Sequence, residues 1–222
     1  MIEIEHIIVG AIATNCWIIP LAPFTGGAAE CALIDPGADS AAIIARLKRQ
    51  NLRPRYILLT HSHFDHIAAL PDLAAAYGEA LEIAIHRAEA ERLGPESREI
   101  HRRDFAAAGD PAYVDILWKP MPCPTRLLSE GDAAGPFRVL HLPGHSPGSA
   151  GFLLEKEKLL FSGDTLFRAG IGRTDLPGGD WNDLRKSLGR LFAMDGDIRV
   201  YPGHGPVTSL AAERWYGWES GV

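Results

Sequence analysis

Three histidines and one aspartate lie close together in the segment Thr60-His61-Ser62-His63-Phe64-Asp65-His66. Alternate side chains of an extended chain point to the same side, so His61 and His63 are expected to face one point. Asp65 and His66 follow where the chain turns into a helix, so both can reach a neighbouring point. Imidazoles and a carboxylate at this spacing suit one or two divalent ions such as zinc. The alternative is a polar helix start in which Asp65 is only the N-cap.

Three further residues with ligand-type side chains follow short apolar runs that end in glycine. These residues are His145, Asp164 and His204. Side chains placed beyond strand ends sit on a rigid scaffold, and glycine lets the backbone turn closely. A lone histidine after Pro-Gly is more often part of a simple turn, so each segment alone is a weak signal. Four such segments together predict a metal site.

The elements that must position these residues alternate between strand and helix in both halves of the chain. Short apolar or alternating runs bounded by turn residues predict strands at 2–5, 16–19, 31–34, 56–59, 81–85, 137–141, 150–154, 158–161 and 199–201. Apolar residues on one face predict helices that begin at Ser40 and that cover 66–77, 100–108, 181–192 and 210–218. Residues 89–125 resemble an irregular surface excursion. The pattern indicates an α/β protein with two packed sheets and outer helices.

Composition limits the possible partners. The 222 residues are 46% hydrophobic and carry a formal net charge of −6, which favours one folded domain over residues 1–222 and disfavours nucleic acid as a partner. No apolar run reaches the ~18 residues of a membrane span, and the N-terminus lacks the basic start of a signal peptide. The three cysteines form no C-x-x-C pair and indicate no disulfide framework. We expect a cytoplasmic protein that acts on a small molecule.

The motifs taken together resemble the metallo-β-lactamase fold superfamily, and within it the glyoxalase II-like hydrolases (hydroxyacylglutathione hydrolases). The resemblance rests on residues 60–66, 143–149, 161–167 and 201–205, with Ile34-Asp35-Pro36-Gly37 upstream. It implies an αββα sandwich of two mixed β-sheets with helices on the outer faces. Because the chain ends soon after Trp218, it is most similar to the short single-domain bacterial group.

The resemblance also implies a binuclear metal site. His61, His63 and His145 would hold a first ion, Asp65, His66 and His204 a second, and Asp164 would bridge both. Zinc is the favoured ion, with iron or manganese as alternatives. Two ions ~3.5–4 Å apart would activate a shared water and polarise a carbonyl, so Asp65 and Asp164 are expected to serve catalysis as well as binding. The implied reaction is hydrolysis of a thioester, such as a hydroxyacylglutathione, by a metal-bridging hydroxide.

Two residues outside the ligand set are expected to contribute to the site. Asp35 is a candidate to accept the second N–H of a ligand histidine, and the alternative is a turn-forming Asp-Pro-Gly. Arg173 matches a position that helps glyoxalase II enzymes to bind glutathione carboxylates, and its alternative is a solvated ion pair with Asp175. His141 is expected to be packed or to support a ligand, and Cys16 to be buried.

Other functions remain as alternatives. The Gly-Arg-Thr-Asp segment at 172–175 is also similar to persulfide dioxygenases, a non-haem iron branch of the superfamily. A non-catalytic scaffold with a retained fold is disfavoured because all seven ligand positions are filled. β-Lactam hydrolysis is disfavoured for a cytoplasmic protein.

Overall fold

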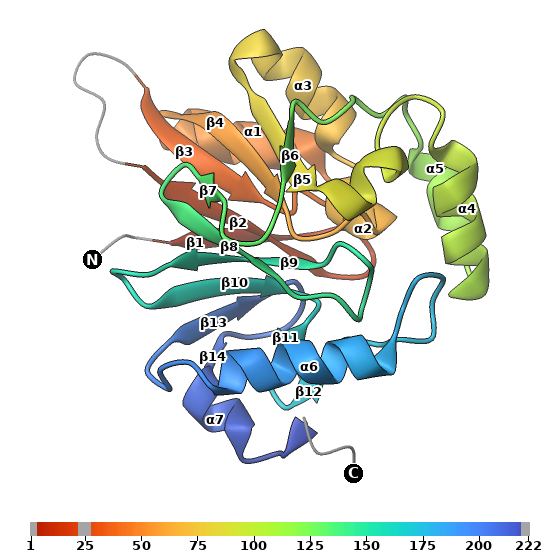
Figure 1. The fold of residues 1–222 in the computed structure, drawn as a ribbon. Helices are drawn as coiled ribbons and strands as arrows, with labels where there is room; N and C mark the ends of the chain where they lie inside the picture. The colour runs from red at the N-terminus through yellow and green to blue at the C-terminus, as the bar shows by residue number, and fades with distance from the viewer. Residues whose placement is uncertain (1–3, 22–27, 219–222) are drawn as a thin grey trace.

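The computed structural model describes residues 4–21 and 28–218 and consists of two six-stranded β-sheets packed face to face, with helices on the outer sides (Figure 1). The first sheet has the order β1-β2-β3-β4-β5-β6, and the second has the order β14-β13-β10-β9-β8-β7. Both sheets contain parallel and antiparallel pairs. The αββα sandwich of two mixed sheets implied by the resemblance is therefore confirmed.

The first half of the chain forms the first sheet and its helices. The strands are β1 (Glu5–Val9), β2 (Thr14–Pro20), β3 (Ala29–Ile34), β4 (Leu52–Leu59), β5 (Glu82–His86) and β6 (Arg126–Leu128). The helices are α1 (Ser40–Arg49), α2 (Phe64–Ile67), α3 (Leu70–Tyr77), α4 (Arg98–Ala107) and α5 (Ala112–Leu117), with 3₁₀ helices η1 (Gly78–Ala80) and η2 (Arg87–Arg92). Because β3, β4 and β5 are parallel, helices must cross between them, and their carboxyl ends meet at one edge.

The second half repeats this plan. Its sheet contains β7 (Ala133–Ala134), β8 (Phe137–His141), β9 (Ala150–Leu154), β10 (Leu159–Gly163), β13 (Arg199–Pro202) and β14 (Thr208–Ser209). A small ribbon of β11 (Leu166–Phe167) and β12 (Gly170–Ile171) follows β10, and α6 (Trp181–Phe192) and α7 (Leu210–Arg214) cover the outer face. The long apolar face of α6 explains why its predicted bounds match the structure.

Three buried apolar clusters hold the four layers together. One lies between the first sheet and its helices and includes Leu47, Leu59 and Leu73. The second fills the space between the sheets and includes Trp17, Phe137, Phe152 and Phe161. The third packs the second sheet against α6 through Leu160, Leu184 and Leu188. Burial of apolar surface, worth ~25 cal/mol per Å², fixes the stacking of the layers.

Several predicted boundaries are wrong. The helix predicted over 66–77 is divided into α2 and α3, because Pro71 in a continuous helix would clash with the carbonyl four residues earlier. His63 holds the N-cap position of α2, so the interpretation of Asp65 as an N-cap is also wrong. The helix predicted over 210–218 ends at Arg214, and Gly217 follows in a left-handed conformation.

The ends of the predicted excursion and of the first strand also differ. The excursion at 89–125 contains two helices, α4 and α5, where one short helix was predicted. The first strand begins at Glu5, and residues 2 and 3 of its predicted range lie outside the described residues. Within residues 4–21 and 28–218, no helix has the length and apolar character needed to cross a membrane.

Candidate metal centre

The seven candidate ligands converge at one edge of the sandwich. His61 and His63 lie in the loop between β4 and α2, and Asp65 and His66 lie in α2 itself. The other three follow strands of the second sheet: His145 comes after β8, Asp164 after β10 and His204 after β13. The site therefore lies where the strand ends of both sheets meet.

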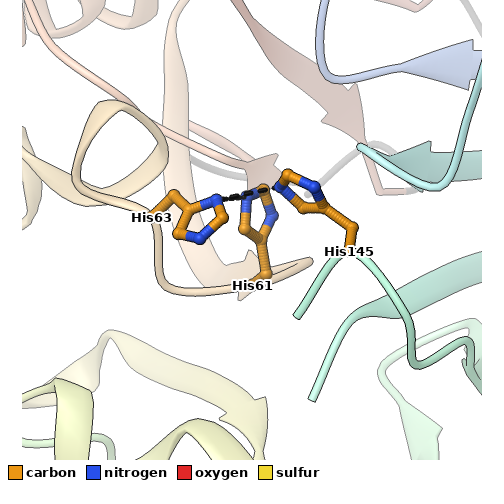
Figure 2. A group of neighbouring side chains, drawn as sticks. All are labelled: His61, His63 and His145. Atoms are coloured by element: carbon orange, nitrogen blue, oxygen red, sulfur yellow. Dashed lines mark hydrogen bonds between the residues drawn. The ribbon is translucent and has the colours of Figure 1, made fainter. Parts of the chain in front are cut away.

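One group consists of three histidines. His63 Nδ1 lies 3.1 Å from His61 Nε2 and 2.9 Å from His145 Nε2, so three ring nitrogens point to one place (Figure 2). The exposed fraction of each residue is 6% or less. Three imidazole nitrogens at this spacing form a suitable ligand set for a divalent ion.

A second group consists of Asp65, His66 and His204. Asp65 Oδ2 lies 3.4 Å from Nε2 of each histidine, and the two Nε2 atoms lie 3.3 Å apart. Asp35, His61 and His66 also satisfy the spacing of a ligand group. Asp35 differs from Asp65 and Asp164 because both of its oxygens accept hydrogen bonds from Thr60, which is not a candidate ligand.

Asp164 lies between the two groups. Its Oδ2 is 3.7 Å from His145 Nε2 and 3.5 Å from His204 Nε2, and its Oδ1 is 3.5 Å from His66 Nε2. Oδ1 is buried without a hydrogen-bond partner. A Cβ atom at Gly203 would come within 2.2 Å of this oxygen, so only glycine leaves the approach open. An unpartnered carboxylate oxygen among converging imidazoles fits a cation shared by the two groups.

Polar groups hold the outer ring nitrogens of His61, His145 and His204. Thr60 Oγ1 donates to Asp35 Oδ2 at 2.6 Å, so His61 Nδ1–H donates to this hydroxyl at 3.0 Å. His145 Nδ1 lies 2.8 Å from the carbonyl oxygen of Arg173, and His204 Nδ1 lies 3.3 Å from that of Ala13. Each arrangement leaves the Nε2 lone pair directed at the centre, as metal ligands require.

Asp35 organises the first-sheet side of the centre. Its Oδ1 accepts the backbone N–H of Thr60 at 2.8 Å, and its Oδ2 lies 3.1 Å from His66 Nδ1. The residue is 1% exposed and has a left-handed backbone with φ of 52°. Asp35 therefore contacts a candidate ligand, and residues 35–37 form an irregular segment without the turn of the alternative interpretation.

Charge is distributed unevenly over the centre. Burial, helped by the neighbouring imidazoles, lowers the pKa of His61 and His63 well below the ordinary histidine value. Burial disfavours ionised Asp65, but His66 and His204 outweigh it and lower its pKa to about 2. The nearby histidines likewise keep the pKa of Asp164 below its ordinary value against the effect of burial. Against the effect of burial, Asp65 and Asp164 raise the pKa of His66 well above the ordinary value and also raise that of His204, so an ion would have to displace a proton there. Neutral imidazoles, as at His61 and His63, beside ionised carboxylates are the forms that bind metal ions.

A cavity of about 400 Å³ opens above the centre. Its lining includes ligands of both groups together with a mostly apolar wall formed by Ile12, Phe105, Ala108, Phe167, Ile171 and Leu176. Arg173 also lines it, and its Nε and Nη2 each lie 2.7 Å from an oxygen of Asp175. The ion pair with Asp175, which was the alternative to a substrate-binding role for Arg173, is present. Arg173 nonetheless lines the cavity.

Sequence reasoning missed several residues that bind the loops of the centre together. Asn15 Nδ2 donates to the carbonyls of Pro202 and Gly205, at 3.0 and 2.8 Å, and so ties β2 to the loop of His204. Thr14 Oγ1 donates to Asp65 Oδ2 at 3.1 Å. Glu89 is fully buried behind the His61–His63 segment. These contacts join residues 27 to 190 positions apart in the chain, so no local sequence pattern predicts them.

The other residues considered from the sequence lie outside the centre. His141 is half-buried, and its ring stacks on that of His86 at 3.9 Å between centroids. Its Nε2 lies 2.9 Å from the carbonyl oxygen of Pro147 in the loop of His145. Cys16 is fully buried, and burial raises the pKa of its thiol.

Known proteins resemble the chain along most of its length. The family model of the metallo-beta-lactamase superfamily matches residues 9–204. The hydroxyacylglutathione hydrolase GloC of Haemophilus influenzae is 33% identical over 217 residues, which make up 96% of this chain and 95% of that protein. The solved structure of TTHA1623 in a di-iron-bound form is 36% identical with a TM-score of 0.80, and that of BLEG-1 B3 metallo-beta-lactamase is 34% identical with a TM-score of 0.79. Both comparisons cover 95% of this chain and 96% of the other.

The chain belongs to the metallo-beta-lactamase superfamily, and the resemblance drawn from its motifs is confirmed. Its relatives include a glyoxalase II-like hydrolase, and its own His and Asp groups are candidates for metal binding.

Proposed function

We propose that the protein is a binuclear metal-dependent thioester hydrolase of the glyoxalase II type. The observation that carries the proposal is the pair of ligand groups, His61–His63–His145 and Asp65–His66–His204, with Asp164 within 3.5–3.7 Å of histidines from both. The similarity to GloC supports the choice of a thioester. Zinc is the favoured metal, and the di-iron form of TTHA1623 makes iron the alternative.

Two divalent ions bound there would supply an activated water and polarise the substrate carbonyl. The protein's own contribution is to hold the ligands in one geometry through the polar groups behind four of the five histidines. A thioester is a suitable substrate because its thiolate leaves without a strong general acid. The cavity walls determine which thioester can enter.

The cavity favours a substrate with both apolar and anionic parts. Phe105, Phe167 and Ile171 offer apolar surface beside the centre. Arg173 is the single arginine or lysine among the described residues of the lining, and it is half exposed. We infer that its guanidinium contacts a carboxylate of the thiol portion, such as that of glutathione, in exchange for part of its contact with Asp175.

The test combines metal analysis with three assays on one preparation. Purified protein is expected to hold close to two metal ions per chain and to hydrolyse S-lactoylglutathione. Hydrolysis should disappear after chelation and return when zinc is added. A protein that binds no metal, or that hydrolyses the thioester after both ions have been removed, would contradict the proposal.

Two other activities are measured in parallel. Oxygen uptake with glutathione persulfide tests the persulfide dioxygenase alternative, and hydrolysis of nitrocefin tests β-lactam hydrolysis, which the similarity to BLEG-1 raises. All three reactions use the same strand-end centre, so the substrate alone separates them. A kcat/KM that is highest for either of these substrates would replace thioester hydrolysis as the function.

A further inference from the structure

Glu89 is a buried carboxylate that belongs to neither ligand group. It lies in η2, directly after β5, and its exposed fraction is 0%. A carboxylate without water must be compensated by hydrogen bonds or by a positive charge, because an uncompensated buried charge is strongly unfavourable. Its partners therefore indicate what this residue does.

The two oxygens of Glu89 bond to two different loops. Oε1 accepts the backbone N–H of Gly148 at 2.8 Å, and Oε2 accepts the hydroxyl of Ser62 in a short hydrogen bond. A Cβ atom at Gly148 would come within 2.5 Å of Glu89 Cγ, so glycine is needed for this close approach. The carboxylate thus fills the space between the two loops.

Arg92 compensates the charge from the other side. Its Nε donates to Ser62 Oγ at 2.9 Å and lies 3.5 Å from Glu89 Oε2, while its Nη2 pairs with Asp104 of α4. His101 Nε2 lies 2.7 Å from the carbonyl oxygen of Arg92. The network therefore runs from the loop of His145, through Ser62, to a helix whose residues Asp104 and Phe105 line the cavity.

The positions of Ser62 and Gly148 in the chain show which candidate ligands Glu89 affects. Ser62 stands between His61 and His63, and Gly148 lies in the turn that carries His145. All three members of the three-histidine group are thus on segments bonded by Glu89. Among the described residues, Glu89 makes no hydrogen bond to the segments that carry His204 and Asp164. The Asp65 group is instead held by Thr14, Asn15 and Asp35.

We propose that Glu89 is a positioning residue for the three-histidine group: it fixes the His61–His63 segment against the turn of His145 and so sets the affinity of that site for its ion. The inference rests on the proposed binuclear centre. Loss of this contact lets the two loops separate, and three nitrogens that must meet within a few tenths of an ångström no longer do. Outer contacts of this kind change metal affinity by ~10–100-fold.

The test measures Zn²⁺ binding, by competition with a chromogenic chelator, on the full chain. Glu89→Gln keeps the shape but replaces one acceptor oxygen by an NH₂ donor, so it cannot accept from both Ser62 and Gly148. In a His204→Ala background, which disrupts the Asp65 group, the change is expected to raise the Zn²⁺ dissociation constant 10–100-fold. In a His63→Ala background, which disrupts the three-histidine group, it is expected to change the remaining dissociation constant less than about twofold, since Glu89 bonds neither Asp65, His66 nor His204, which Thr14, Asn15 and Asp35 hold instead.

Two variants keep the result interpretable. Glu213→Gln is the matched control, because Glu213 is also a buried carboxylate that joins two segments, by accepting from Ala169 N and Thr208 Oγ1, but neither segment carries one of the three histidines. It should leave Zn²⁺ binding by the three-histidine group unchanged. Ser62→Ala removes a single bond of Glu89 and should weaken the same site in the same direction, so it replaces Glu89→Gln if that variant fails to fold.

The outcomes separate this inference from the proposed function. An unmodified protein that binds no Zn²⁺ would contradict the binuclear centre itself. An unmodified protein that binds two ions, with unchanged or equal effects of Glu89→Gln in both backgrounds, would overturn only the role of Glu89.

Discussion

At the scale of single residues, four of the five histidines of the centre are constrained at both ring nitrogens. One nitrogen points to the centre, and the other is held by Thr60, Asp35 or a backbone carbonyl. This arrangement fixes the tautomer and the ring plane together, so little reorganisation remains when an ion binds. Arg173 contributes in two ways: its backbone carbonyl oxygen lies against His145 Nδ1 and positions that ring, and its side chain lines the cavity.

Asp164→Asn and Arg173→Ala should separate metal binding from substrate binding. Asp164→Asn removes the anionic oxygens that lie between the groups, and we expect loss of metal and a fall in kcat on the order of 100-fold or more. Arg173→Ala keeps the carbonyl that holds His145, and we expect a rise in KM of roughly tenfold with kcat unchanged. Steady-state kinetics and metal analysis of both variants provide the measurement.

The two variants also serve as controls for each other. Metal content should fall in Asp164→Asn and remain at the original level in Arg173→Ala. A lower kcat with an unchanged KM in Arg173→Ala would show that this side chain acts in the transition state and not in substrate binding.

The candidate ligands could be predicted from the sequence because each lies in a short motif at a strand end. Their partners could not. Glu89 has no motif around it, and its role depends on a turn of the chain that brings it against Ser62 and Gly148. Asn15 depends on the docking of one sheet against the other. Long-range contacts of this type become visible only in the folded chain.

At the scale of elements, α4 is the least expected part of the fold. Its sequence is polar, but it buries His101, Asp104 and Phe105 and forms one wall of the cavity. His101 packs against the rings of Phe64 and Trp118, with centroids 5.7 and 5.9 Å away. The excursion is therefore a packed wall of the cavity. Its sequence pattern looks irregular and polar because its few buried residues contact α2 and the cavity as well as a sheet.

His101 should make stability depend on pH. Burial, together with the charge of Arg92, lowers its pKa to about 4, although the Arg92 carbonyl favours the protonated form. In the unfolded chain its pKa is ~6.5, so between these values the unfolded state binds a proton that the folded state does not. The free energy of unfolding should therefore fall as the pH drops from 7 to 4.5, by about 2 kcal/mol from this residue.

Urea unfolding at pH 7 and at pH 4.5 tests this expectation. His101→Gln can still donate to the Arg92 carbonyl but does not titrate, so its free energy of unfolding should fall by about 2 kcal/mol less than that of the unmodified protein. Equal losses in the two proteins would mean that His101 is protonated in the folded state well above pH 4.

At the scale of the whole molecule, the centre is a joint between two similar halves. Four candidate ligands come from the first sheet's side, and three come from loops of the second. The backbone of Asn15 donates to Gly203 at 2.7 Å, which adds a direct bond across the joint. The layered architecture could be predicted because strands and helices alternate in both halves. The strand order could not, since pairing depends on how the layers dock.

Removal of metal should destabilise the entire molecule. An ion at 100 times its dissociation constant adds ~2.7 kcal/mol to the free energy of unfolding, which for a chain of this size corresponds to a Tm shift on the order of 5–10 °C. We expect that shift downward on chelation and its reversal on addition of Zn²⁺, measured by thermal unfolding. Chelation of His63→Ala should produce a smaller shift, and an unchanged Tm in the unmodified protein would show that no ion is bound across the joint.

The distance along the chain between the ligands has a consequence for how the protein is made. His145 is synthesised 82 residues after His63, and His204 is synthesised 138 residues after His66. A growing chain on the ribosome exposes His61, His63, Asp65 and His66 long before the residues that complete either group. Tight capture of an ion by either group would therefore have to wait until the second sheet has been made and has docked, so a bound metal would be a property of finished molecules alone.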